Sequence, residues 1–443
     1  MTKLIRGLLC VLAFGYISIR AFSAVDNSIG VFQTAAVHAG VVTDDNSLQC
    51  AGQPANKIIV TCPPYRAVPN DNQDDSKAFQ AAVDALPRSG GTIVVPAGTY
   101  LFSNALLIQK PVHLVGAGPT TILTHSTNLS TDGQANFIRI GGVASRTEGV
   151  AISDLTMQGP EWSQLRTPMI RIVSNLKGVK IRNLSFRHVS STCVLIYGDN
   201  IRDVEISDNR ADEFYEQFVE LSTGGISGVR IERNITKSTR GHPNLGSTEP
   251  FGVMFEPHAP GEISDVSIVG NSISFDGMSS AELINTGGIS LSTGPAKGYA
   301  YRRVSILDNT IRSAGVGIRV QTLRSGGIGE PGSVKIVGNR VEGVKSYGIL
   351  VNAGGDSAQR NAVSITKNVI RGYSAQAYYK YDGIRVEGSS VAPEIRGNQI
   401  LPLTDGGTNS GRYGISIDSG VRNAAIKDNK IAGYHLGAIS TSK

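Results

Sequence analysis

The stretch VSIVGN, residues 266–271, decides the fold because the chain repeats its pattern. Copies of V-x-I-x-x-N begin at Val204, Val229, Val304, Val334 and Val363, and weaker copies begin at Pro393 and Ala424. Two earlier copies, at Val150 and Val179, carry leucine in place of the asparagine. Neighbouring copies begin 25 residues apart at the closest (204 and 229) and 38 at the widest (266 and 304). Self-similarity with such a period is typical of solenoid proteins.

A second phrase, G-I-x-V, lies between the copies, for example as GIRV at 317–320 and again at 383–386. Both phrases alternate apolar and other residues, as strands with one buried face do. No helix-length pattern separates them, so the strands are expected to close into stacked coils. We therefore predict an all-β fold, a single-stranded right-handed parallel β-helix of about ten or more coils, each about 4.8 Å from the next.

One asparagine ends most copies of the first phrase, and these asparagines are expected to stack at one turn of the solenoid. Stacked amides can hydrogen-bond along the axis, and asparagine tolerates a left-handed backbone at a tight turn. A ligand-binding row is the alternative, but the match between the asparagine period and the coil period favours a structural role. The predicted ladder contains Asn209, Asn234, Asn271, Asn309, Asn339, Asn368, Asn398 and Asn429.

The first 24 residues have the order of a secretory signal. Lys3 and Arg6 precede the apolar run LLCVLAFGYISI, and small residues suited to cleavage follow at 21, 23 and 24. An uncleaved membrane anchor is the alternative, but the run is shorter than the roughly 20 residues that span a bilayer. We predict a signal peptide at 1–24, an N-terminal extension at 25–68, a β-helix domain at 69–443, and a secreted or periplasmic location.

The start of the solenoid is expected to be closed by a short helix within DDSKAFQAAVDAL, residues 74–86. Phe79, Ala82, Val83 and Leu86 share one helical face, and Asp74 or Asp75 can cap the amino end. Cys50 and Cys62 could pair as a disulfide in an oxidising compartment, which the sequence leaves open. Cys193 has apolar neighbours and is expected in the core.

The charge and the cysteine pattern exclude several classes of partner. The net charge is +6 without any polybasic run, so we expect no nucleic acid. No segment after the signal is apolar enough to span a membrane, and no cysteine spacing matches a zinc site. We assign no metal and no other cofactor, and the oligomeric state is not predicted.

The helix segment 74–86, the following GGTIVVPAGTY at 90–100 and the coils together resemble the pectate-lyase-like superfamily, specifically its rhamnogalacturonase/epimerase-like branch. The resemblance runs from about residue 70 onward. It implies a right-handed β-helix that binds polysaccharide in a groove along one face. Members include lyases, hydrolases, epimerases and phage tailspike depolymerases, so the resemblance leaves the reaction open.

The alignment of the second phrase predicts which side chains face outward. Val194, Val219, Val253 and the isoleucines at 289, 318, 349, 384 and 415 should point inward, and the residue after each should point outward. Glu220 and Glu256 then lie on adjacent coils of one face, with Cα atoms about 8 Å apart. A glycosidase needs two carboxylates about the scissile bond, at about 6.5–9.5 Å in inverting enzymes or nearer in retaining ones. Cleavage by this pair is the first functional prediction, although outward acids on a solenoid are also common as solvated surface.

Other residues on the same predicted face could bind an acidic sugar. Arg319 and Arg385 could hold a carboxylate through charge-assisted hydrogen bonds, and Glu387 lies in the outward row of Glu256. Tyr197, one coil before Glu220, could stack on a sugar ring or transfer a proton. The insertion 238–252, which contains His242, could form a wall of the site, or it could be a tolerated surface loop.

The stretch FEPHA at 255–259 is similar to the D-P-H-[ED] signature of mannuronan C5-epimerases, in which the histidine and a nearby tyrosine exchange the C5 proton. Glu256 stands in place of the aspartate, Ala259 in place of the last acid, and Val253 where the tyrosine is expected. The resemblance implies elimination or C5 epimerisation through His258 and Tyr197 as the second prediction. A non-catalytic glycan-binding or surface-structural β-helix is the third.

Overall fold

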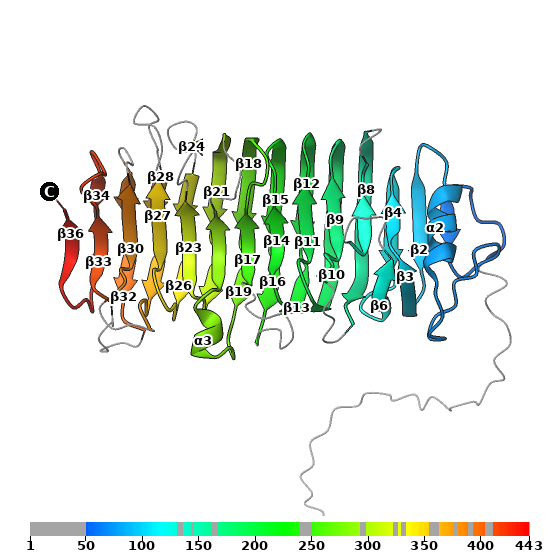
Figure 1. Cartoon of the computed structure of the whole chain (residues 1–443), viewed down its shortest axis with the longest axis horizontal. Coiled ribbons are helices and arrows are strands. Elements are labelled where there is room, and N and C mark those ends of the chain that lie inside the picture. Colours follow the sequence, from blue (N-terminus) through cyan, green and yellow to red (C-terminus); the bar gives the residue numbers. More distant parts are fainter. Residues whose placement is uncertain are drawn as a thin grey trace, which may run out of the picture. The chain divides into compact units, whose positions relative to one another are not determined.

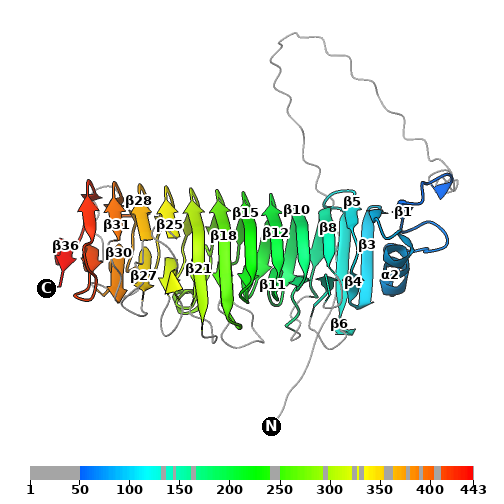
Figure 2. The ribbon, with the colours of Figure 1, turned by 90° about the horizontal axis from the view of Figure 1, so that it is seen from above.

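Strands dominate the chain because short alternating apolar runs are separated by turns along nearly its whole length. The computed structural model describes residues 50–130, 136–142, 146–160, 166–239, 250–292, 298–321, 327–328, 334–353, 363–375, 380–388, 393–403 and 411–442. They lie in one unit, Asn46–Lys443. Within this unit the strands follow one another along a single axis in sequence order, as Figures 1 and 2 show. The predicted signal peptide, residues 1–24, and His242 lie outside the described residues.

The smaller sheet contains twelve parallel strands, and each coil contributes one of them. Its strands carry the second sequence phrase and face the viewer in Figure 1. In chain order they are β4 (Leu106–Ile108), β7 (Ile138–Ile140), β9 (Ile170–Val173), β11 (Val194–Tyr197), β14 (Gln217–Leu221), β17 (Phe251–Phe255), β20 (Gly287–Leu291), β23 (Val316–Gln321), β27 (Ile349–Ala353), β30 (Ile384–Gly388), β33 (Tyr413–Ile417) and β36 (Gly437–Thr441).

The larger sheet has 24 parallel strands in two series, joined where the long strands β8 and β10 take part in both. One series carries the first phrase: β1 (Lys57–Ile59), β2 (Gly91–Val95), β5 (Val112–Gly116), β8 (Thr147–Gln158), β10 (Leu176–Val189), β12 (Ile201–Ser207), β15 (Ile226–Glu232), β18 (Gly261–Val269), β21 (Tyr299–Leu307), β24 (Gly327–Ile328), β25 (Val334–Val337), β28 (Val363–Thr366), β31 (Glu394–Arg396) and β34 (Ala425–Lys427). The other contains β3 (Gly98–Asn104) and β6 (Thr121–Ser130) and then the strands that follow the asparagine turns: β13 (Arg210–Phe214), β16 (Ile235–Lys237), β19 (Ser272–Ser274), β22 (Thr310–Arg312), β26 (Arg340–Glu342), β29 (Val369–Arg371), β32 (Gln399–Leu401) and β35 (Lys430–Ile431).

This arrangement confirms the predicted parallel β-helix and its register. Val219 pairs with Val253, Val253 with Ile289, and Ile289 with Ile318. These side chains are buried in one continuous core that extends along the coils. Coils approach closely at the glycine that opens the second phrase. A Cβ at Gly317 would lie 2.3 Å from the carbonyl oxygen of Gly348, so a larger residue does not fit there.

The asparagine ladder is confirmed, although one reason given for it is wrong. From Asn234 onward, each ladder asparagine Oδ1 accepts from the backbone N–H and the Nδ2 of the asparagine on the preceding coil, as Asn309 does from Asn271 at 3.0 and 2.9 Å. The left-handed backbone belongs to the residue before each asparagine, with φ between 53° and 69°, and not to the asparagine. Those residues are Asp208, Arg233, Gly270, Asp308, Gly338, Lys367, Gly397 and Asp428.

Helix α2 (Ser76–Ala85) covers the first coil, as predicted. Phe79 is fully buried, and its ring centroid lies 4.8 Å from that of Phe102. Asp75 is the N-cap residue without a side-chain cap bond, whereas Asp74 accepts from the Ser76 N–H at 3.0 Å. The other described helix, α3 (Ser280–Leu283), begins with a capping box between Ser279 and Glu282. None of the described helices is long and apolar enough to cross a bilayer.

The structure shows the state of the cysteines, which the sequence left open for Cys50 and Cys62. Cys50 and Cys62 form a disulfide with a Cα–Cα distance of 5.5 Å, and Cys193 is buried as predicted. Strand β1, which lies within the segment assigned to the N-terminal extension, pairs with β2 in the larger sheet. The disulfide therefore ties Cys50 to the turn that follows the first strand of the solenoid.

Candidate functional site

The register of the smaller sheet brings Glu220 and Glu256 to the same outward face. Glu220 on β14 pairs with Met254 on β17, and Glu256 lies two residues further along. The ladder continues past the end of β17, because the Glu256 N–H donates to the Leu221 carbonyl at 2.9 Å. The predicted offset of one coil and two residues is therefore correct. The pairing of β14 with β17 alone brings the two acids together.

Glu220 lies in a polar niche below the surface of this face. Its Oε1 accepts a short hydrogen bond from Ser222 Oγ, and its Oε2 lies 3.4 Å from Thr192 Oγ1. Burial raises the pKa of Glu220 to about 7, with a further increase from the carboxylates of Glu256 and Glu216 that the Ser222 bond partly offsets. Glu220 can therefore hold a proton near neutral pH and donate a hydrogen bond.

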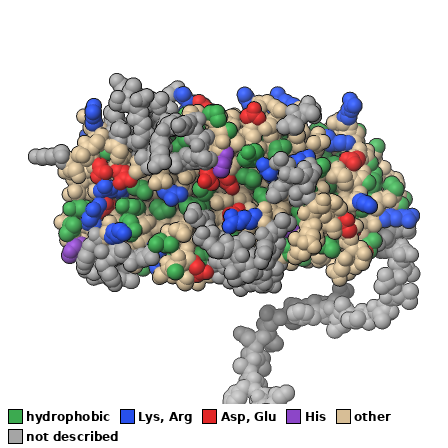
Figure 3. Space-filling model, viewed as in Figure 1, with side chains coloured by type: hydrophobic (Ala, Val, Ile, Leu, Met, Phe, Trp, Pro, Cys, Tyr) green, Lys and Arg blue, Asp and Glu red, His purple; other side chains and the backbone are tan. Residues whose placement is uncertain are grey.

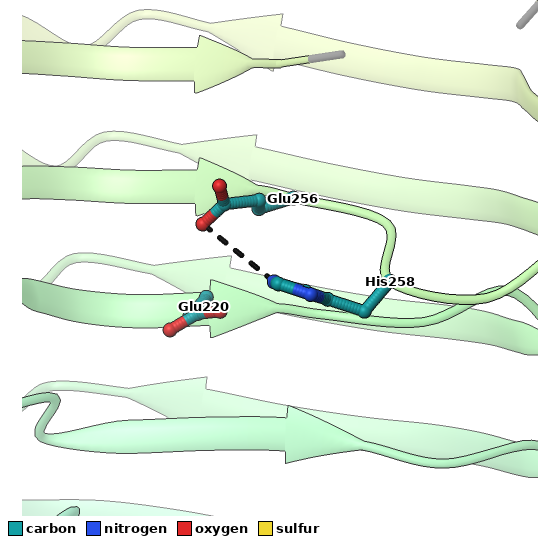
Figure 4. Close-up of side chains that lie close together, drawn as sticks. All are labelled: Glu220, Glu256 and His258. Atoms are coloured by element: carbon teal, nitrogen blue, oxygen red, sulfur yellow. Dashed lines mark ion pairs between the residues drawn. The ribbon is translucent and has the colours of Figure 1, made fainter. Parts of the chain in front are cut away.

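The turn after β17 places His258 beside both glutamates. Pro257 restrains Glu256 to an extended backbone, and the His258 N–H donates to the Ser222 carbonyl at 2.7 Å, which anchors the turn to the preceding coil. The imidazole points back along the strands, as Figure 4 shows. Its Nε2 lies 3.9 Å from Glu256 Oε2, close enough for electrostatic attraction but longer than a hydrogen bond. Both side chains are partly open to solvent, at 42% for His258 and 35% for Glu256.

We call Glu220, Glu256 and His258 the acid–imidazole cluster. One carboxylate oxygen of each glutamate and a ring nitrogen of His258 all lie within 4.8 Å of one another. At least one oxygen of each glutamate thus lies close to an oxygen of the other, which brings the two carboxyl groups together as the sequence analysis predicted. The same three atoms are the donors, among the described residues, that could hold a cation, although the sequence predicts no metal.

Tyr197 lies at the end of β11, one coil before Glu220, as predicted. Its side chain is exposed, and the guanidinium of Arg171 lies 4.6 Å from the ring centroid. The described contacts of the phenol do not include the acid–imidazole cluster. Proton transfer by Tyr197 and stacking of its ring on a sugar therefore both remain predictions.

The other predicted binding residues differ in their surroundings. Arg319 lies in the outward row of Glu220, where its Nε donates to Ser290 Oγ at 2.9 Å. Arg385 lies in the same row but faces three carboxylates: Asp418 at 2.6 Å, Glu387 at 3.2 Å and Asp382 at 3.7 Å. Glu387 also accepts from Asn352. Arg385 and Glu387 are thus partners of each other, and a binding role for either arginine remains a prediction.

Sequence reasoning missed two arginines at the other end of the same row. Arg139 pairs with Arg171, and Arg171 pairs with Leu195, which pairs with Glu220. The signal was present in the I-R-I triplets at 138–140 and 170–172, which have the alternation of the second phrase without its glycine. Figure 3 shows acidic and histidine atoms gathered midway along this face, with Lys and Arg atoms on either side. The face therefore has an acidic centre with arginines in the same row on both sides of it.

Two family models match the chain. Residues 63–162 match the rhamnogalacturonase A/epimerase, pectate lyase-like family, and residues 170–363 match the right-handed β-helix region. The matches agree with the resemblance and the right hand predicted from the sequence.

Curated relatives match only a short part of the chain. A mannuronan C5-epimerase of Azotobacter vinelandii is 32% identical over 103 residues, which are 21% of this chain and 7% of the epimerase. Alginate lyase 7 of the same organism is 34% identical over 94 residues, which are 19% of this chain and 11% of the lyase. The chain thus matches about a tenth or less of these relatives' own length.

Solved structures share the fold at low identity. The A-module of another A. vinelandii mannuronan C-5 epimerase has a TM-score of 0.58 at 18% identity and covers 87% of this chain and 98% of its own. The surface adhesin PfbA of Streptococcus pneumoniae has 0.60 at 15%, covering 84% and 91%. A GH87 α-1,3-glucanase of Streptomyces thermodiastaticus has 0.53 at 16%, covering 89% and 69%. The fold is therefore common to carbohydrate-active enzymes and to an adhesin.

Proposed function

We propose that this pectate-lyase-like β-helix protein is a polysaccharide-active enzyme that removes the C5 proton of a uronate unit bound over the acid–imidazole cluster. The observation that carries the proposal is the position of His258 within 4.8 Å of a protonatable glutamate and a solvent-open one. Hydrolysis of a glycosidic bond requires two carboxylates but no imidazole. Proton abstraction requires a base and a group that stabilises the negative charge formed on the substrate carboxylate.

His258 has the geometry of the base. Its neutral imidazole accepts the C5 proton, and the negative charge of Glu256 at 3.9 Å stabilises the imidazolium that forms. Glu256 is thus a positioning and electrostatic partner, comparable to the carboxylate that supports a catalytic histidine elsewhere. The exposure of both side chains leaves them accessible to a polymer lying in the groove.

Glu220 has the properties of the stabilising acid. Its raised pKa of about 7 keeps it protonated up to neutral pH, so it can donate a hydrogen bond to the uronate carboxylate. That bond becomes stronger as the electron pair of the broken C5–H bond moves into the carboxyl group. A carboxylic acid kept neutral by burial is a known device for stabilising such charge.

Two outcomes follow from the same first step. In elimination, the electron pair forms the C4–C5 double bond, the C4–O4 bond breaks, and O4 leaves with the proton that the imidazolium of His258 gives back. In epimerisation, the bond to O4 stays intact and a proton returns to C5 from the opposite face. The second outcome needs a donor on that face, and exposed Tyr197 on the adjacent coil is the sequence-based candidate.

Hydrolysis, which the sequence analysis placed first, is here the second candidate, because one observation favours it specifically. A carboxylic acid with a pKa near 7 beside a second carboxylate is the arrangement that a glycosidase uses for its general acid. In that case Glu220 protonates the glycosidic oxygen and Glu256 acts as nucleophile or base.

The proposal includes action outside the cytoplasm. The predicted signal at 1–24 supports export, and the Cys50–Cys62 disulfide is of the kind that persists in an oxidising compartment. The proposed partner is a polysaccharide.

The experiment is incubation of the protein with uronate polymers in D₂O. Deuterium at C5 of the intact polymer indicates epimerisation, ultraviolet-absorbing unsaturated ends indicate elimination, and new reducing ends with neither indicate hydrolysis. We expect one of the first two signals, lost in a His258→Ala variant. If the protein binds the polymer but produces none of these three signals, the enzymatic proposal is overturned in favour of a binding protein.

A further inference from the structure

A cavity of about 260 Å³ opens on the face of the smaller sheet, away from the acid–imidazole cluster. Its floor is formed by strand residues of β23 and β27, including Arg319, Gln321 and Leu350. Its walls come from the turns that hold Asn285, Lys345, Tyr347 and Tyr381. The volume is near the lower end of small-molecule sites and suits one sugar unit rather than a long ligand.

The described lining residues of this cavity include two cationic side chains. Arg319 and Lys345 both line it, and none of its described lining residues is acidic. The Arg319 guanidinium lies 5.0 Å from the ring centroid of Phe251 and is oriented through the Nε bond to Ser290. The Lys345 ammonium lies 3.3 Å from Ser280 Oγ. The Lys380 ammonium lies over the ring of Tyr381, 5.5 Å from its centroid. A planar guanidinium and a nearby ammonium suit a carboxylate ligand.

The aromatic wall of the cavity suits a sugar ring. The rings of Tyr347 and Tyr381 meet edge to face with centroids 5.0 Å apart. Burial raises the pKa of Tyr347, so its hydroxyl stays a hydrogen-bond donor. A rigid aromatic surface with polar tips offers both an apolar contact and hydrogen bonds to a ligand that has both characters.

The cavity is in line with the acid–imidazole cluster along the solenoid axis. Gln321 lies in the outward row of Glu256, two coils further on, and Arg319 lies in the row of Glu220, three coils further on. Two to three coils correspond to roughly 10–14 Å. A sugar unit is about as long as one coil is high, so a polymer along the groove would reach the cavity with its second or third unit beyond the reacting one.

We propose that this cavity is a second subsite, which binds the carboxylate of a neighbouring uronate and so selects a polyanionic polymer and fixes its register. The inference rests on the proposed function for the direction of the polymer, but the cavity's preference for a carboxylated sugar can be measured without turnover. Its ligand class is an acidic sugar unit within a polymer, held by Arg319 and Lys345 and packed on Tyr347 and Tyr381.

The test measures affinity for mannuronan dimers and hexamers, and for carboxyl-reduced hexamers as a matched neutral probe. Wild-type protein is expected to bind the hexamer more tightly than the dimer and the neutral hexamer. Arg319→Ala with Lys345→Ala should weaken hexamer binding about tenfold or more, because charge-assisted bonds are lost. The single variant Arg319→Lys should bind the hexamer more tightly than the double variant but more weakly than the wild-type protein. Lys335→Ala, which removes an exposed lysine from the larger sheet on the same coil, should leave all three affinities unchanged.

The outcomes separate this inference from the proposed function. The subsite proposal would be overturned if the double variant and the wild-type protein, both shown to be folded by circular dichroism, bound the hexamer with equal affinity. This holds whether or not the protein turns over the polymer. Equal affinity of wild type for the charged and the neutral hexamer would overturn it as well. Charge-dependent hexamer binding that the double variant loses, in a wild-type protein without any turnover, would support the subsite and contradict the enzymatic proposal.

Discussion

The asparagine turn and the outward face of the smaller sheet repeat with the same period but vary in opposite ways. At the turn, buried asparagines from Asn209 to Asn398 make the same pair of bonds to the next coil. On the face, the residue changes at almost every coil along the row Arg139, Arg171, Leu195, Glu220, Met254, Ser290, Arg319 and Leu350. Both positions use the same coil geometry, but only the turn uses one chemistry throughout.

The difference teaches where to look for function in a solenoid. A position that must hydrogen-bond to its own copy on the next coil tolerates little variation, because a change leaves two coils with unpaired buried groups. An outward position makes no such demand, so its residues can be set one by one for a ligand. A charged residue in the outward row of Glu220 is therefore more informative than an asparagine in the ladder.

The largest expected effect is on the outward face. Glu220→Gln should lower kcat/KM on the polymer by about 10²–10⁴-fold, because the amide cannot transfer a proton and its less acidic N–H gives the developing charge a weaker hydrogen bond. The measurement is initial rate against polymer concentration, with folding checked by circular dichroism. Glu205→Gln is the matched control, since Glu205 faces outward on the larger sheet and pairs with Arg230. Full activity of the Glu220 variant would remove the assignment.

The next effect is on the ladder. Asn309→Ala removes the acceptor for two donors of Asn271 and the donor to Asn339, Ile268 and Leu307. Because several buried groups lose their partners, we expect a loss of about 3 kcal/mol or more in the free energy of unfolding. Chemical denaturation measures it, and kcat/KM per folded molecule should stay at the wild-type value. A loss of activity without a loss of stability would mean that the two regions are not separate.

The features that repeat were predictable from the sequence. The parallel solenoid, the inward valines and isoleucines, the ladder and the offset of Glu220 from Glu256 all follow from one periodic pattern, because each coil imposes its register on the next. The left-handed residue before each asparagine was assigned to the wrong position. The repeated phrase has asparagine at the turn, but the left-handed residue is the one before it. Asp, Arg, Lys and Gly all occur at that preceding position, so the sequence gives no sign of its left-handed backbone.

The features that depend on how coils are decorated were only partly predictable. The depth of Glu220, its bonds with Ser222 and Thr192, and the direction of the His258 ring depend on side-chain packing across three coils. The acids around Arg385 occupy positions that recur in the repeat, since Asp382 precedes the glycine of the second phrase and Asp418 follows β33, but the residue type at these positions differs from coil to coil. The carboxyl-binding cavity uses Tyr347 and Tyr381, which lie in turns of unequal length. Periodicity alone therefore locates the face but does not place these groups.

A smaller effect concerns how Glu220, on the outward face of the smaller sheet, changes the stability of the protein with pH. The folded pKa of Glu220 is raised to about 7 above an ordinary value of 4.5, so the folded protein holds a proton that the unfolded chain releases between these values. Glu220 therefore lowers the free energy of unfolding as pH rises through this window, and above about pH 7 the penalty is complete. Glu220→Gln should be more stable than wild type at pH 8 by on the order of 1–3 kcal/mol, and equal to it near pH 4. Denaturation of both proteins across this range measures the difference.

The smallest expected effect is at the end of the ladder. Asn429 accepts from the backbone N–H and the Nδ2 of Asn398, both at 2.9 Å, but it is partly exposed, unlike the buried Asn309. Water can replace its bonds, so Asn429→Ala should cost about 1 kcal/mol or less. Comparison with Asn309→Ala under the same denaturant measures the combined contribution of burial and of the donor bonds to the next rung, because the substitution and the acceptor bonds are the same. Equal costs at the two positions would show that each rung acts alone, and that the ladder gains nothing from being enclosed between coils.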